Sequence, residues 1–175
     1  PVGSARILPA GEMSLGIGGM GRTSRLTAGV DQPGPEAGVV EIRGGLAGGR
    51  LEAGYTITVP WHMAWDLKLG ILSEDGWRPA VAARADLGLF QPSFGGALLV
   101  TRTLGPCSLT LLGETGRRNE RLWMTGAGPY ATDSENHIKV VRGAGGEITA
   151  ALSPIHDAYV AVMYWTTRTE HEAPR

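Results

Sequence analysis

The chain has 175 residues, of which 42% are apolar and 19% are charged, and its net charge at pH 7 is −1. This composition excludes a disordered chain, offers no basic field for nucleic acid, and leaves Cys107 without a partner for an internal disulfide. No apolar stretch is long enough for a membrane-spanning helix. We therefore expect residues 1–175 to form a single folded domain.

Alternation of apolar and polar residues, the period of a β-strand, runs through most of the chain, whereas helical periodicity is nearly absent. The 27 glycines lie inside apolar segments, where they disfavour helices and allow bulges and close strand packing. The pattern predicts nine strands in chain order, at residues 11–20, 39–46, 51–59, 63–71, 81–89, 96–104, 107–116, 138–152 and 158–168.

The predicted connections fall into two groups, one for each end of the strands. Those of the first group are all short, at residues 47–49, 73–77, 105–106 and 153–157. Those of the second group lie at residues 21–37, 60–62, 91–95 and 117–136, and the first and last of them are long loops. Strands of roughly nine to eleven residues with short turns at one rim and longer loops at the other are typical of transmembrane β-barrels.

The distribution of charge predicts which face of the strands points inward. Between residues 39 and 89 every charge falls on one parity of four strands, and the other parity is apolar. A soluble barrel also alternates, but with its apolar face inward. The inverted arrangement is favoured because the charged parity carries small residues such as Gly54 and Gly70, which fit a narrow interior. Opposite charges such as Asp66 and Lys68 also share that face, where they can pair when buried.

Aromatic residues gather near the predicted strand ends, at Trp61, Trp65, Trp77, Tyr164 and Trp165. Rings in these places are typical of the aromatic girdles at membrane interfaces, although ordinary core aromatics are the alternative interpretation. Together these patterns predict an all-β protein, an up-and-down antiparallel transmembrane β-barrel of about eight to ten strands.

The charged parity supplies a set of candidate lumen-lining residues: Glu12, Glu41, Arg43, Glu52, Asp66, Lys68, Arg84, Asp86, Arg102 and Glu114. They could line a selective pore or form the ionic filling of a narrow barrel. At about eight to ten strands the interior is only just wide enough to hold side chains. We therefore expect these residues to fill the lumen.

Two stretches of the chain resemble bacterial outer-membrane β-barrel proteins of the Gram-negative type. The opening Ala5-Arg6-Ile7-Leu8-Pro9-Ala10-Gly11 before a glycine-rich strand is similar to the start of many such barrels. Residues 40–72 resemble their second to fourth strands, with a hairpin of the pattern RxGL…RLExG before a strand containing Asp66-Leu67-Lys68. The resemblance implies a place in the cell outer membrane, with outer-membrane lipid as the surrounding partner.

Two features depart from the pattern of these barrels. The chain ends in polar residues at positions 166–175, without a terminal aromatic signature. The predicted strand count of nine is odd, whereas single-chain bacterial barrels have even numbers. Either one strand is miscounted, or the final strand is missing from the chain.

The second long loop carries a set of candidate partner-docking residues: Arg117, Arg118, Arg121, Trp123 and Tyr130. Arginine and aromatic residues are enriched at protein interfaces, and loops on a rigid scaffold often carry binding residues. We therefore expect this rim to dock a protein partner or a surface glycolipid. A solvated loop is the alternative interpretation.

Two patterns that could signal chemistry have simpler interpretations. Residues 16–21 match G-x-G-x-x-G, but no helix follows, as a dinucleotide site would require. Ser153, His156 and Asp157 combine the residue types of a catalytic triad inside a tight polar turn, and triads are recognised by geometry. The other histidines are scattered without ligand spacing, so neither a metal nor another cofactor is expected.

The sequence thus predicts a non-enzymatic outer-membrane β-barrel that serves as a scaffold, a partner-docking element or a very narrow channel. Two alternatives stay open. A soluble β-barrel with its apolar face inward would bind a small apolar ligand. A membrane-embedded enzyme on the same scaffold would modify lipids.

Overall fold

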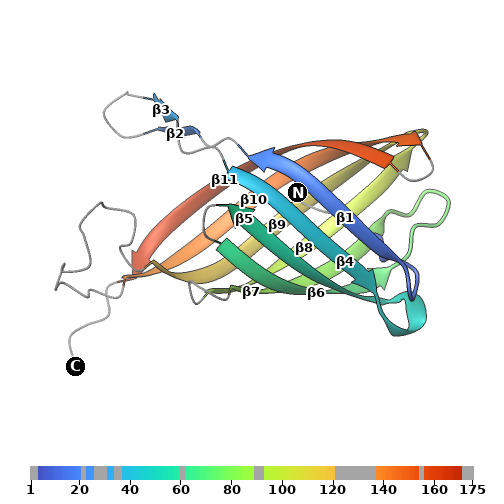
Figure 1. The fold of residues 1–175 in the computed structure, drawn as a ribbon, viewed down its shortest axis with the longest axis horizontal. Helices are drawn as coiled ribbons and strands as arrows, with labels where there is room; N and C mark the ends of the chain where they lie inside the picture. Colours follow the sequence, from blue (N-terminus) through green and yellow to red (C-terminus); the bar gives the residue numbers. More distant parts are fainter. Residues whose placement is uncertain are drawn as a thin grey trace.

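The computed structural model describes residues 4–20, 23–25, 31–33, 37–59, 62–88, 93–120, 137–153 and 156–170. Nine strands form one antiparallel sheet in which neighbours follow one another along the chain (Figure 1). They are β1 (Met13–Met20), β4 (Ala37–Gly45), β5 (Leu51–Val59), β6 (His62–Leu72), β7 (Ala80–Gly88), β8 (Ser93–Leu104), β9 (Cys107–Glu120), β10 (His137–Ser153) and β11 (His156–Glu170).

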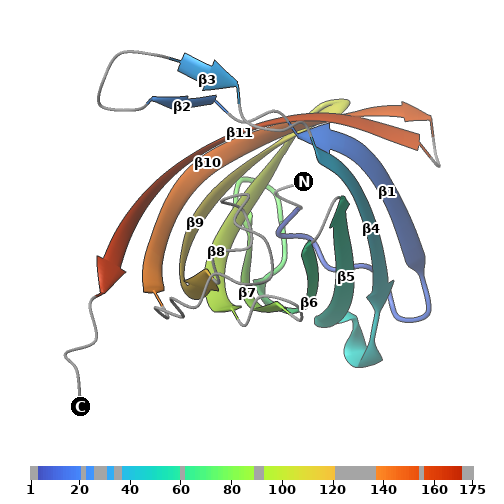
Figure 2. The same cartoon turned by 60° about the vertical axis from the view of Figure 1, so that its left-hand side comes forward.

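The sheet curls into a half-barrel, so that its two edges, β1 and β11, turn toward each other (Figure 2). At one point they come close, because a Cβ atom added to Gly18 of β1 would contact the hydroxyl of Tyr159 on β11. No backbone pairing joins β1 to β11 within the described residues. The expected all-β, up-and-down antiparallel architecture is confirmed, whereas the sheet as described is an open one.

Two of the predicted long loops contain more β-structure than expected. Residues 21–37 include a small separate sheet of β2 (Thr23–Arg25) and β3 (Asp31–Pro33). β9 continues past Gly116, so the expectation that the second loop begins at Arg117 was wrong: Arg117 pairs with Val140 of β10. The reason is that β10 pairs with β9 as far as Glu120 and β8 pairs with it as far as Arg118, and these backbone hydrogen bonds outweigh the polar character of the side chains.

Side-chain exposure alternates along the strands with charge inside and apolar groups outside. On β6, Asp66 and Lys68 are 7% and 3% exposed, whereas Leu67 and Leu69 are 48% and 51% exposed. The same holds around the sheet for large apolar side chains that stay exposed: Met13, Leu15, Ile17, Trp65, Ile71, Leu87, Leu98, Leu111, Ile148, Val160 and Val162. The concave face is therefore the buried one, although it carries the charges.

Among the described residues, the buried apolar side chains form one small cluster of Ala5, Ala80, Ala82, Ala97, Leu99 and Leu112, and Val39 and Val141 are buried outside it. Ile7 and Met163 pack against it. Most of this cluster comes from β7, β8 and β9, near the end where β7 begins and β8 ends. No helix among the described residues is long and apolar enough to cross a membrane.

Candidate functional site

Three neighbouring strands bring a group of charged side chains together on the inner face. Arg43 lies opposite Gly54, which lies opposite Asp66, and Glu52 lies opposite Lys68. Cross-strand partners share one face of the sheet, so the register collects these side chains. Gly54 leaves the space between them, because a Cβ atom there would lie 2.9 Å from Arg43 Nη1 and would also meet the Asp66 carboxylate.

These charges form a connected network, which we call the ionic layer (Glu41, Arg43, Glu52, Asp66 and Lys68). Arg43 Nη1 donates to Asp66 Oδ1 at 2.8 Å and to Glu52 Oε1 at 3.1 Å, and Arg43 Nε contacts the Glu41 carboxylate. Lys68 Nζ lies 2.7 Å from Glu52 Oε1. All five side chains are at most 10% exposed. Buried charges need such partners, and the layer lines the interior on the side of β4, β5 and β6.

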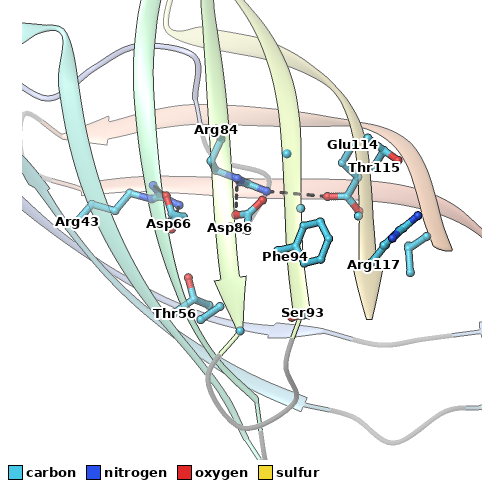
Figure 3. Close-up of a pocket in the computed structure, with 16 residues that line it drawn as sticks. Arg43, Thr56, Asp66, Arg84, Asp86, Ser93, Phe94, Glu114, Thr115 and Arg117 are labelled. Carbon is cyan, nitrogen blue, oxygen red and sulfur yellow. Dashed lines mark hydrogen bonds and ion pairs between the residues drawn. The ribbon is translucent and has the colours of Figure 1, made fainter. Parts of the chain in front are cut away.

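A second charged group surrounds a cavity of about 200 Å³ toward the end where β5 ends and β8 begins. Arg84 Nε lies 2.9 Å from Asp86 Oδ1, and Arg84 Nη2 lies 3.9 Å from Glu114 Oε2 (Figure 3). Arg43 and Asp66 also line this cavity, so it borders the ionic layer. Its lining combines charged side chains of both signs with Phe94, Val141 and several glycines, and the charged part can bind water and small ions.

Residues 4–9 lie against the inner face, within the curve of the sheet; we call them the inner segment (Figure 2). Ala5 is 1% exposed, and its backbone N–H donates to Thr101 Oγ1 at 2.7 Å. Thr101 in turn shares a 2.8 Å hydrogen bond with the Thr110 hydroxyl. The inner face of the strands, which we call the wall, thus binds Ala5 through two buried hydroxyl groups. Ile7 adds apolar contact beside it.

The ionic layer also holds the inner segment. The Leu8 N–H donates to Glu52 Oε2 at 3.0 Å, and Lys68 Nζ donates to the Ser4 carbonyl at 2.9 Å. Glu52 and Lys68 therefore each bind one partner on the wall and one on the inner segment. These two bonds hold the backbone of the segment, which bends at Ala5 and Arg6.

Glu74 holds the segment at the rim, in the connection between β6 and β7. Its carboxylate accepts hydrogen bonds from Arg6 Nη2 at 2.9 Å, from Thr103 Oγ1 at 2.7 Å and from the Thr103 N–H at 2.7 Å. The bonds from Thr103, with a further contribution from the Arg6 guanidinium, lower the pKa of Glu74 from its ordinary value of 4.5. Glu74 thus forms a partly exposed ion pair with Arg6.

The ten predicted lumen residues occupy three settings. Those in the ionic layer are buried: Glu41, Arg43, Glu52, Asp66 and Lys68. Those around the cavity are half-buried: Arg84, Asp86 and Glu114. The other two lie near the rim of short turns, where Glu12 precedes β1 and is exposed, and Arg102 donates to the Arg78 carbonyl at 3.2 Å.

The predicted docking residues are only partly described. Arg117 lies in β9, is exposed and borders the cavity. Arg118 also lies in β9, paired with Lys139 of β10. Arg121, Trp123 and Tyr130 lie outside the described residues.

Sequence reasoning missed a row of inward residues on β8, β9 and β10. Thr101 lies opposite Thr110, which lies opposite Glu147, and all three are at most 4% exposed. Thr110 could have been found, because it shares the parity of Glu114. Glu147 could not, because glycines at positions 143, 145 and 146 break the alternation before it.

The turn with Ser153, His156 and Asp157 contains one of the contacts of a catalytic triad, the one between serine and histidine. Ser153 Oγ lies 3.0 Å from His156 Nδ1, but the hydrogen bond is exposed, across the turn between β10 and β11. Among the described residues Asp157 makes no hydrogen bond to His156, and the cavity lies elsewhere. This geometry does not orient the imidazole as a triad does.

Comparisons of this chain with protein-family models, with curated proteins and with solved structures find no match. The function proposed below therefore rests on the residues and geometry of this chain.

Proposed function

We propose that the chain is a non-enzymatic transmembrane β-barrel of the outer-membrane type, whose filled interior makes it a membrane scaffold rather than an open pore. The observation that carries this proposal is the inverted burial pattern. Leu67 and Leu69 are about half exposed on the convex face while Asp66 and Lys68 are buried on the concave face. A soluble barrel has the opposite pattern.

The size of the apolar surface adds support. Side chains on strands at both edges of the sheet, such as Leu15, Ile17, Val160 and Val162, are 67–73% exposed. Soluble monomers rarely expose contiguous apolar patches beyond a few hundred Å². Hydrocarbon chains of a lipid bilayer would cover such a surface without a protein partner.

A membrane setting also requires the two sheet edges to be satisfied. Unpaired backbone N–H and C=O groups cost several kcal/mol each in hydrocarbon. We infer that β1 and β11 close the barrel against each other, and the proximity of Gly18 to Tyr159 supports this. Because nine strands alternate in direction, the first and the last run the same way, so the closing pair would be parallel.

Docking of a protein or glycolipid partner through the end of β9 and the segment that follows it remains part of the proposal, and Arg117, in β9, is the candidate whose side chain is described and exposed. A soluble barrel that binds an apolar ligand gains no support, because the concave face carries the ionic layer. Membrane insertion is therefore the property to test first.

The test is to export the chain in a Gram-negative host behind a cleavable signal sequence and to fractionate the cells. We expect the protein in the outer membrane, resistant to alkaline washing and released only by detergent. The folded form should also migrate differently from the boiled form on a denaturing gel. Recovery in the periplasmic fraction without detergent would contradict the proposal.

A further inference from the structure

The inner segment lies within the curve of the sheet, and its bonds to Thr101 and Glu74 place it toward the end of the short turns. We propose that residues 4–9 are a removable plug, and that their displacement opens a path for cations through the interior. This inference rests on the proposed membrane function, because a path between two compartments needs a closed barrel in a bilayer. It goes beyond that function by assigning an activity to the interior.

The wall is shaped to receive the segment. A Cβ atom on Gly45 would lie 2.5 Å from the Leu8 carbonyl oxygen and would also meet that of Pro9. One on Gly70 would lie 2.8 Å from Ile7 Cγ1. Glycine at these two positions is thus what lets the segment lie directly against the wall. A Cβ atom added to Gly44, the neighbour of Gly45, would meet nothing within 4 Å.

The contacts that hold the segment are few and reversible. Ala5, Leu8 and Ser4 each make one backbone hydrogen bond to a wall side chain. Arg6 adds an ion pair with Glu74, in which the two side chains are 45% and 19% exposed. A partly exposed ion pair of this kind contributes little, and the strongest of the hydrogen bonds are those to the buried charges of Glu52 and Lys68. The strands of the sheet pair independently of the segment, so its departure leaves the sheet folded.

The charge of the wall determines which ions would pass. Among the described residues, the buried ionisable side chains are four carboxylates and two cations: Glu41, Glu52, Asp66, Glu147, Arg43 and Lys68. The excess is negative, and a narrow low-dielectric passage amplifies the attraction of such an excess for cations. The cavity of about 200 Å³ beyond the ionic layer continues the path, and its carboxylates (Asp66, Asp86 and Glu114) are balanced by three arginines (Arg43, Arg84 and Arg117). The selection of cations therefore falls to the buried side chains of the wall.

The experiment compares four proteins in planar bilayers under a KCl gradient: the full chain, a variant lacking residues 4–9, Gly45→Ala and Gly44→Ala. We expect no steady current from the full chain or from Gly44→Ala. The deletion variant should conduct continuously, with a reversal potential shifted toward that of K⁺. Gly45→Ala should show intermittent openings. A synthetic peptide of residues 4–9 should close the deletion variant.

Insertion is checked separately, by heat-dependent gel migration of protein recovered from the same vesicles. If the deletion variant inserts but carries no current, the plug proposal is wrong. Large, stable single-channel currents from the full chain would also contradict it. A shift toward the Cl⁻ potential would overturn the assignment of the ion. If the deletion variant fails to insert, the current from Gly45→Ala becomes the test, and the absence of openings in that variant would contradict the plug proposal. If no variant inserts, the proposed membrane function fails, and the plug fails with it.

Discussion

Lys68 and Glu52 face each other on adjacent strands, with Lys68 Nζ 2.7 Å from Glu52 Oε1, and their side chains are 3% and 1% exposed. Each also binds the inner segment, Lys68 through the Ser4 carbonyl and Glu52 through the Leu8 N–H. One ion pair thus joins the wall of the sheet to the segment that lies inside it.

Replacement of Lys68 by methionine should destabilise the protein by about 3–5 kcal/mol, because the Glu52 carboxylate then stays buried without its nearest cation. Urea unfolding of the refolded protein in detergent micelles measures the loss. Arg50→Met, at an exposed position, is the control and should change little. The double variant Glu52→Gln with Lys68→Met should recover part of the loss. If Lys68→Met behaved like the control, the pair would have no structural role.

Leu67→Arg tests the outward face of β6. A charge on the lipid face near the middle of a bilayer costs roughly 2–4 kcal/mol, so unfolding in lipid vesicles should shift by that amount. Ser73→Arg, at an exposed position directly after β6, adds one positive charge outside the strands as the control. A Leu67→Arg protein as stable as this control would argue for a water-facing convex surface.

The proposed closure of β1 against β11 can be tested with a double-mutant cycle. Gly18→Ala should destabilise by about 1–3 kcal/mol, as overpacking does, because the new methyl group meets the Tyr159 hydroxyl. Tyr159→Phe removes that hydroxyl and should restore most of the stability of Gly18→Ala. Gly19→Ala, whose added Cβ atom meets nothing within 4 Å, should be silent. Additive effects of the two changes would mean that the strands do not meet there.

The lowered pKa of Glu74 predicts that the stability of the protein depends on pH. Its pKa in the folded protein is lowered from 4.5, so its hydrogen bonds contribute stability above pH 4.5, and this contribution is lost as the pH falls through the lowered value. The difference in melting temperature between the native protein and Glu74→Gln should therefore be present near neutral pH and should shrink in acid. A difference that does not change with pH would exclude the ionised carboxylate as its source.

The sequence predicts the fold well wherever alternation alone determines it. Asp66, Leu67 and Lys68 lie on the expected faces of β6, because a period of two leaves no other arrangement once one face is buried. The expected ranges of the nine strands match the strands of the sheet to within a few residues at most ends. The extension of β9 through Arg117 was missed because polar side chains on both faces look like a loop.

The inner segment could not have been predicted, because its partners are distant in the sequence. Ala5 binds Thr101, 96 residues away, and Ser4 binds Lys68, 64 residues away. No local sequence pattern at Ala5 or Ser4 indicates these partners, which come together only when the strands of the sheet have paired. The approach of the Tyr159 hydroxyl to Gly18 is equally remote from any local pattern.

The place of residues 4–9 has a consequence for the order of folding. They precede every strand of the sheet, yet the Thr101 hydroxyl that binds Ala5 belongs to β8. Contacts of such sequence separation form late, because a long loop must close first. These residues are therefore synthesised before the strands and seated after most of them, and the wall assembles around an interior that is still unfilled.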